Sequence, residues 1–288
     1  MVNSIDFFGF KKHPFNLTPD SSFFYLSKRH SEVAKSIYSG LIQNKGVFLI
    51  SGEVGTGKTL TSRVLIEKLN KNFHIAYILN PFLDSLGIVK NIAEEFGLPS
   101  EGKRLDALIT QIHFFLIESM KKEGKGGIVI IDEAQHLPDE SLEMVRVLSN
   151  LETSNKKLLQ FVLVGQNELL SKLSKKNLRQ LAQRVAIKAI LTPLDLSETY
   201  DYIFHRIRQA GGIGKLEFNK ISILNIYRLT KGYPRSINIL MDNILNKAAE
   251  ERKKIIDTKL VQKAYKNVLP FPFRVLPFTI AKLFKGHI

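Results

Sequence analysis

The residues with the clearest chemistry lie in one short segment, where a lysine and a threonine follow closely spaced glycines. The spacing is a glycine, four residues and then Gly-Lys-Thr, which is the pattern of a phosphate-binding loop. Glycine permits a tight turn whose backbone N–H groups converge on one anion. Lys58 adds a positive charge for the β- and γ-phosphates, and the Thr59 hydroxyl is a ligand for Mg²⁺. We predict that a nucleotide is bound by Gly52, Glu53, Val54, Gly55, Thr56, Gly57, Lys58, Thr59 and Leu60.

The residues around this segment predict the elements that hold it. Residues 47–51 form an apolar run typical of a buried strand, and residues 60–69 have helical spacing. The loop is therefore expected between a strand and a helix N-terminus, where the helix dipole favours phosphate. A glycine-rich turn that matches the pattern by accident is the alternative, and these flanks argue against it.

Two carboxylates follow a second apolar run, at residues 128–131. Parallel strands end at one edge of a sheet, so this pair is expected beside the phosphate loop. We predict that Asp132 holds Mg²⁺ through water and that Glu133 polarises the water that attacks the γ-phosphate. Because a protein that only senses nucleotide needs the first carboxylate and not the second, Glu133 favours hydrolysis. Two solvated acids at the end of a buried strand are the alternative.

Three further residues in this part of the chain are candidates for the same chemistry. Gln166 follows the strand predicted at 159–164 and is expected to reach the γ-phosphate or the attacking water; its alternative role is that of a turn residue. Arg179 and Arg184 precede the strand predicted at 185–191. Either is a candidate to stabilise transition-state charge in a neighbouring subunit, and we favour Arg184 because it is nearer to the strand. A basic surface helix is the alternative.

An arginine near the C-terminal end of the chain is the last candidate. Arg235 follows Gly232-Tyr233-Pro234 and falls in the first turn of a predicted helix. A helix N-terminus is an unfavourable place for a cation, so another reason for Arg235 is needed. We predict that it contacts the γ-phosphate, with a plain surface arginine as the alternative.

The alternation of strands and helices predicts an α/β fold. Apolar strands separated by helices up to residue 193 indicate a P-loop core with a parallel sheet sandwiched by helices. The spacing between Lys58 and Asp132 allows another strand to lie between the two motif strands. Helices at 197–210, 219–230, 234–251 and 258–267, with no strand candidate, indicate a small all-helical lid. The predicted parts are a lead-in segment 1–45, the core 46–193, the lid 194–268 and a Pro-containing amphipathic tail 269–288.

Charge is distributed unevenly over the 288 residues, whose net charge is +15. Residues 1–150 carry 17 Lys and Arg against 17 Asp and Glu, whereas residues 151–288 carry 25 against 10. A basic face for nucleic acid or acidic lipid is one reading, and a solvated lysine-rich surface is the other. There is no cysteine, no signal-peptide pattern and no apolar run of about 20 residues, which fits a cytoplasmic location.

These motifs, in this order, resemble those of AAA+ ATPases, and more narrowly of the general secretion pathway protein A (ExeA/GspA) family. The resemblance covers about residues 5–267 and is carried by Phe7-Phe8-Gly9-Phe10, Pro14-Phe15, Thr18-Pro19-Asp20, Phe24-Tyr25-Leu26-Ser27, His30, the two motifs above, Ala134-Gln135, Leu148-Ser149-Asn150-Leu151-Glu152-Thr153, Leu163-Val164-Gly165-Gln166, Leu178-Arg179-Gln180-Leu181 and Gly232-Tyr233-Pro234-Arg235. It implies an AAA+ fold, a homo-oligomer such as a hexamer or ring, and hydrolysis of ATP with Mg²⁺ to assemble or remodel a protein partner in secretion or envelope assembly. A DNA-associated transposition helper is the alternative that it leaves open.

Longer members of that family continue into a transmembrane helix and a peptidoglycan-binding domain, so the resemblance here is to a short form. In the tail, Leu276, Ile280, Leu283 and Phe284 recur at helical spacing among lysines. Such a helix is expected to lie on a membrane surface, to dock on a partner or to pack on its own domain. Peripheral contact with the inner face of the membrane is therefore one expectation for this chain.

Overall fold

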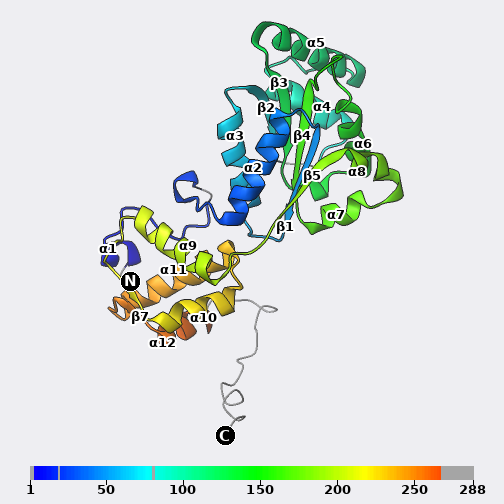
Figure 1. The fold of residues 1–288 in the computed structure, drawn as a ribbon. Coiled ribbons are helices and arrows are strands. Elements are labelled where there is room, and N and C mark those ends of the chain that lie inside the picture. The colour runs from blue at the N-terminus through cyan, green and yellow to red at the C-terminus, as the bar shows by residue number, and fades with distance from the viewer. Residues whose placement is uncertain (1–2, 19, 80–81, 267–288) are drawn as a thin grey trace. The chain divides into compact units, whose positions relative to one another are not determined.

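A five-stranded parallel sheet organises residues 19–192 of the computed structural model, which describes residues 3–18, 20–79 and 82–266 (Figure 1). Its strands lie in the order β2-β3-β4-β1-β5. Strand β4 therefore lies between β1 and β3, the two motif strands, as the spacing of the motifs allowed. The strand bounds are β1 Val47–Gly52, β2 Phe73–Ile78, β3 Gly126–Ile131, β4 Leu159–Gly165 and β5 Val185–Leu191.

Helices cover both faces of this sheet because its strands are apolar on both faces. Along β1, Val47 and Leu49 join one buried cluster, whereas Phe48 and Ile50 join the other, as the alternation of a pleated strand requires. Helices α2 (Lys28–Ile42) and α3 (Lys58–Leu69) pack on the second face. The first face is covered by α4 Ser85–Glu95, α5 Leu105–Glu123, α6 Asp139–Leu148, and the shorter α7 Asn167–Leu173 and α8 Arg179–Arg184. The predicted α/β sandwich is confirmed.

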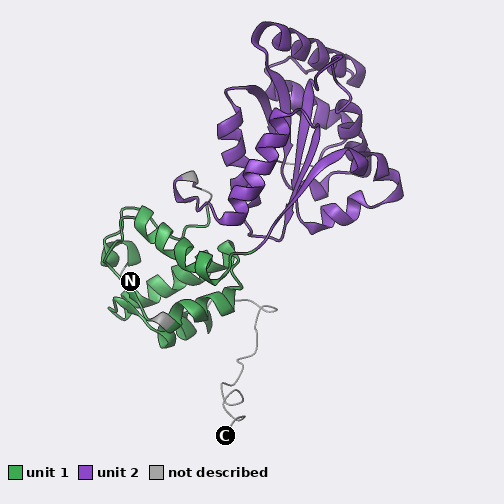
Figure 2. Ribbon diagram, in the orientation of Figure 1, with its two compact units in different colours: residues 1–18, 193–288 green, residues 19–192 purple. Residues whose placement is uncertain are grey.

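The remaining described residues form a second, mostly helical unit, drawn in green in Figure 2. The side chain of Asp195 caps α9 and forms a capping box with Glu198, and Pro234 occupies the first turn of α11. The helices of this unit are α1 Ser4–Phe8, α9 Leu196–Gln209, α10 Lys220–Thr230, α11 Pro234–Glu250 and α12 Thr258–Lys266.

The helical unit also contains strands, so the expectation of no strand in this region was wrong. Strand β6 (Glu217–Phe218) pairs in parallel with β7 (Ile255–Ile256). Two residues are too few to produce an alternating pattern in a sequence, because the period of a strand is itself two residues. The pair joins the start of α10 to the start of α12, since each strand directly precedes one of these helices.

The segment predicted as a lead-in, residues 1–45, contributes to both units. Its first part, residues 1–18, groups with the helical unit, where α1 contacts α11 and Ser4 Oγ donates a 2.7 Å hydrogen bond to Asn246 Oδ1. Its second part contains α2, which packs on β5 of the α/β unit. The predicted tail 269–288 lies outside the described residues. Among the helices that are described, none is long and apolar enough to cross a membrane.

Candidate functional site

The two sequence motifs meet at the carboxyl edge of the sheet. Ser51 of β1 pairs with Gly165 of β4, and Ile131 of β3 pairs with Leu163 of the same strand. The residues that follow these three strands therefore emerge side by side. They are the phosphate loop, the pair Asp132 and Glu133, and Gln166. Sequence reasoning placed all of them at this edge, and the structure brings them together.

The loop after β1 has the backbone geometry of an anion-binding turn. Gly55 and Gly57 have φ values of 83° and 92°, which side-chain-bearing residues rarely adopt. The hydroxyl of Thr56, which is fully buried, donates a 2.8 Å hydrogen bond to the carbonyl of Glu53 and closes the turn. Helix α3 starts directly afterwards, at Lys58, so its unpaired N–H groups face the loop.

Lys58 lies folded over the loop with its ammonium group next to carbonyl oxygens. Its Nζ donates hydrogen bonds of 2.9 Å to the Gly52 carbonyl and 3.0 Å to the Glu53 carbonyl. Only 6% of the residue is exposed, and this burial lowers its pKa, while the charges of Glu133 and Asp132 partly offset the shift. A buried ammonium group that is paired mainly with neutral oxygens is well suited to receive the negative charge of a polyphosphate.

Asp132 is buried and accepts three hydrogen bonds. Its Oδ2 accepts one from Thr59 Oγ1 at 2.7 Å and one from the Tyr77 hydroxyl at 3.2 Å, and its Oδ1 accepts one from the Glu133 N–H at 2.9 Å. Burial, and then the charge of Asp132, raises the pKa of Tyr77, so its hydroxyl remains a donor. Tyr77, on β2, was not predicted as a site residue because a tyrosine in an apolar strand looks like core.

Glu133 is held by two amide side chains and has an unusual backbone. Its φ of 52° lies in the left-handed region, which costs a residue with a side chain on the order of 1 kcal/mol. Gln135 Nε2 donates a 2.6 Å hydrogen bond to Glu133 Oε2, and Gln166 Nε2 approaches the same oxygen at 3.4 Å. The backbone N–H of Gln166 donates in turn to Gln135 Oε1 at 3.0 Å. The carboxylate is thus oriented by side chains from the segments that follow β3 and β4.

These groups fit a magnesium nucleotide. Within the described ranges, no three or more acidic, histidine or cysteine side chains lie close enough together to bind a metal ion. The described residues therefore contain no metal site built only from such side chains. Thr59 and Asp132 instead offer two neighbouring oxygens, and Mg²⁺ is usually held by one or two protein oxygens together with phosphates and water. Thr59 and Asp132 are therefore the residues that would hold the metal, and this role stays a prediction.

Arg184, one of the two arginines predicted to act on a neighbouring subunit, lies at the other edge of the sheet. Val185, next to Arg184, pairs with Val47 at the start of β1, whereas the phosphate loop follows the end of that strand. Arg184 Nη1 donates a 3.3 Å hydrogen bond to Ser149 Oγ, and Arg179 is exposed. Among the described residues no hydrogen bond or ion pair joins either arginine to the phosphate loop, so their action on a neighbouring subunit stays a prediction. Arg235, in the first turn of α11, belongs to the helical unit, and its contact with a nucleotide also stays a prediction.

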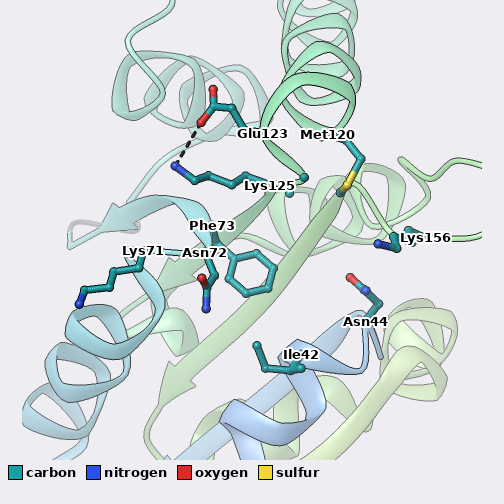
Figure 3. A pocket seen from close by; sticks show the side chains of 11 residues that line it. Ile42, Asn44, Lys71, Asn72, Phe73, Met120, Glu123, Lys125 and Lys156 are labelled. Atoms are coloured by element: carbon teal, nitrogen blue, oxygen red, sulfur yellow. Dashed lines mark ion pairs between the residues drawn. The ribbon is translucent and has the colours of Figure 1, made fainter.

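A cavity of about 300 Å³ lies at this same far edge, before β2 and β3 (Figure 3). It shares no residue with the loop or the carboxylates. Lys125 at its rim pairs with Glu123 at 3.1 Å. The lining residues are Ile42, Asn44, Lys71, Asn72, Phe73, Met120, Glu123, Gly124, Lys125, Gly126 and Lys156. The candidate nucleotide site at the carboxyl edge of the sheet is therefore separate from this cavity.

The fold and the site together define a nucleotide-binding P-loop protein of the AAA class. Residues 41–173 match the family model of the AAA domain. Three solved structures share the fold: the Aeropyrum pernix ORC2 protein, Cdc6p from Pyrobaculum aerophilum and the RuvB branch migration motor of Thermotoga maritima. Their TM-scores are 0.68, 0.62 and 0.53 at 18%, 20% and 20% identity, over 90%, 88% and 82% of this chain and 72%, 72% and 68% of theirs.

General secretion pathway protein A of Aeromonas hydrophila is much closer in sequence. It is 40% identical over 261 residues, which are 90% of this chain and 47% of the relative. The predicted resemblance to the general secretion pathway protein A family is therefore confirmed. This chain spans about half the length of that relative.

Proposed function

We propose that this protein hydrolyses ATP at the carboxyl edge of the sheet. The observation that carries the proposal is the position of Glu133, whose carboxylate lies beside the metal-binding pair and is aimed by Gln135 and Gln166. A protein that only bound nucleotide would have no use for a second carboxylate oriented in this way. The left-handed backbone of Glu133 supports the same view, because strain of this kind is retained where the geometry is needed.

Each residue has a separate task in this proposal. Lys58 would exchange its two carbonyl partners for the β- and γ-phosphate oxygens, and Thr59 and Asp132 would hold the metal. Bound Mg²⁺ supplies positive charge that offsets the charge on the β- and γ-phosphates. Glu133 accepts the proton of the attacking water, while Gln166 is close enough to sense the γ-phosphate or to orient that water.

We propose that groups from a neighbouring copy and from the helical unit complete the site. We propose that a homo-oligomer, such as a ring, brings Arg184 or Arg179 of a neighbouring copy to the transferred phosphate, because Arg184 lies at the edge of the sheet away from the loop of its own unit. Arg235 of the helical unit is proposed to contact the γ-phosphate. Both contacts would make hydrolysis depend on assembly and on the position of the helical unit.

The proposed role of turnover is to assemble or remodel a protein partner of a secretion or envelope pathway, on the cytoplasmic side of the membrane. The similarity to general secretion pathway protein A supports this pathway over a DNA-associated transposition helper. The likenesses to DNA-processing proteins are at 20% identity or less and support the fold alone.

The test compares ATP binding and phosphate release in the wild-type protein and in Glu133→Gln. We expect the variant to bind ATP with unchanged or higher affinity, because a negative charge near the phosphates is removed, and to release phosphate about 10²- to 10⁴-fold more slowly. Glu168→Gln is the matched control, since exposed Glu168 also acts electrostatically on Lys58 but lies on α7. Wild-type protein without ATP-dependent phosphate release, or Glu133→Gln with turnover like that of the control, would contradict the proposal.

A further inference from the structure

A buried histidine contacts a backbone carbonyl of the phosphate loop and has no part in the chemistry described so far. His30 lies near the start of α2 and is 3% exposed. Its Nε2 lies 2.8 Å from the carbonyl oxygen of Thr56, and its Nδ1 lies 2.6 Å from Ser27 Oγ. The Phe24 ring packs edge-on against the imidazole at a centroid distance of 5.9 Å, which helps to fix the plane of the ring.

These two contacts define the tautomer of His30. A carbonyl oxygen only accepts hydrogen bonds, so Nε2 must carry the proton that is donated to Thr56. In a neutral imidazole Nδ1 is then the acceptor, and the Ser27 hydroxyl donates to it. Ser27 Oγ also accepts the backbone N–H of His30 at 3.2 Å as the N-cap of α2. Serine, imidazole and loop carbonyl thus form one chain of hydrogen bonds with a single direction.

The contact controls the orientation of one peptide group in the loop. In a planar trans peptide the C=O and the following N–H point in opposite directions. Because the Thr56 carbonyl is held toward His30, the N–H of Gly57 must point to the opposite side of the peptide. The Gly57 position also requires close approach, since a Cβ there would lie 2.8 Å from His30 Nε2.

We propose that His30 is a positioning residue that holds the Thr56–Gly57 peptide so that the Gly57 N–H faces the phosphates of the nucleotide. The inference rests on the proposed function of the loop as an ATP site. In loops of this pattern the backbone N–H groups bind the α- and β-phosphates. Loss of the His30 contact should therefore weaken ATP and ADP equally, unlike changes at Glu133, which act on the γ-phosphate and the water.

Two neutral substitutions separate the two ends of the imidazole. In His30→Gln the new side-chain amide reaches about as far as Nε2 and can donate to the Thr56 carbonyl, whereas the shorter amide in His30→Asn occupies the place of Nδ1 beside Ser27. We expect His30→Asn to raise the Kd of a fluorescent ATP analogue and of its ADP counterpart about tenfold each, and His30→Gln to stay within about twofold of wild type. Circular dichroism checks that both variants are folded.

The outcomes are distinct. If wild-type protein binds the analogue and both variants bind as wild type does, or both are weakened equally, His30 does not position this peptide. If wild-type protein does not bind the analogue at all, the proposed ATP site itself fails, and the inference fails with it.

A measurement on the wild-type protein covers the case in which a variant does not fold. Nuclear magnetic resonance of protein labelled with ¹⁵N-histidine reports which ring nitrogen carries the proton. We expect the Nε2–H form for His30, with a shift of that N–H when Mg²⁺ and ADP are added. The Nδ1–H form, or an Nε2–H signal that ADP leaves unchanged, would overturn the proposal.

Discussion

Removal of the Tyr77 hydroxyl tests whether Asp132 is the carboxylate that holds the metal. The hydroxyl donates to Asp132 Oδ2 at 3.2 Å, and it stays protonated because burial, and then the charge of Asp132, raises its pKa. Tyr77→Phe retains the ring, which packs against the core, and deletes one of the three donors to a buried charge. The stability of the α/β unit should therefore fall together with its affinity for Mg²⁺-nucleotide.

The size of the effect follows from the geometry. Hydrogen bonds to charged groups contribute about 1.5–3 kcal/mol, and the 3.2 Å distance is longer than is typical for a donor to a carboxylate, which places this bond at about 1.5 kcal/mol. For a unit of this size that corresponds to a fall of about 3–6 °C in Tm. The Tyr77 hydroxyl would also orient Asp132 in the complex with Mg²⁺ and nucleotide, so its loss is expected to weaken the metal site as well as the free protein.

The assay is thermal unfolding without ligand, with ATP alone and with ATP and Mg²⁺. We expect the rise in Tm on adding Mg²⁺ to the protein with ATP to be smaller in Tyr77→Phe than in wild type. Tyr38→Phe is the control, because Tyr38 packs on the same core cluster and its hydroxyl has no hydrogen-bond partner among the described residues. If adding Mg²⁺ raised the Tm of Tyr77→Phe and Tyr38→Phe by the same amount, the assignment of Tyr77 and Asp132 to the metal site would be refuted.

Three further predictions address the loop, the assembly and the helical unit. Gly57→Ala should weaken ATP binding at least about tenfold in equilibrium titration, because φ is 92° and the new Cβ meets a buried ring; wild-type affinity would contradict this. Arg184→Ala and Glu133→Gln should each be inactive alone, yet a mixture should regain phosphate release if the arginine acts on a neighbouring copy; no recovery would move the prediction to Arg179. Hydrogen bonds from two lysines lower the pKa of Glu251 to about 2 from an ordinary 4.5. Its stabilisation is therefore complete above pH 4.5 and lost toward pH 2, so Glu251→Gln should flatten the acid side of a plot of Tm against pH; an unchanged slope would argue against the shift.

The sequence predicted the core of the fold because its signals there are local. Apolar strands, the glycine spacing and the Asp132-Glu133 pair each occupy a few consecutive residues, and parallel strands bring their ends to one edge. The spacing between Lys58 and Asp132 allowed a strand between β1 and β3, and β4 lies there. Because Gln166 directly follows β4, this strand order brings it beside Glu133.

The residues that were missed act through contacts between distant segments. Tyr77 and His30 look like core residues, since nothing in the neighbouring sequence indicates that one faces Asp132 and the other the Thr56 carbonyl. The left-handed backbone of Glu133 has no sequence signal either, because glycine, asparagine and aspartate are the residues that usually mark such positions. The β6–β7 pair joins segments far apart in the chain, and each partner is only two residues long.

The helical unit is made from the two ends of the described chain, and this has a consequence for its synthesis. Arg206 on α9 is buried and donates to the carbonyls of Pro14 and Asn16, and Phe8 and Phe10 are buried as well. Residues 3–18 are translated before the α/β unit, but the helices that they contact are translated only after the whole of that unit. The sheet can therefore complete its folding during translation, whereas the helical unit can form only after the sheet has been translated, on a segment that was made before the sheet. A fragment that begins at residue 19 would keep every strand of the sheet and still leave Arg206 without two of its acceptors.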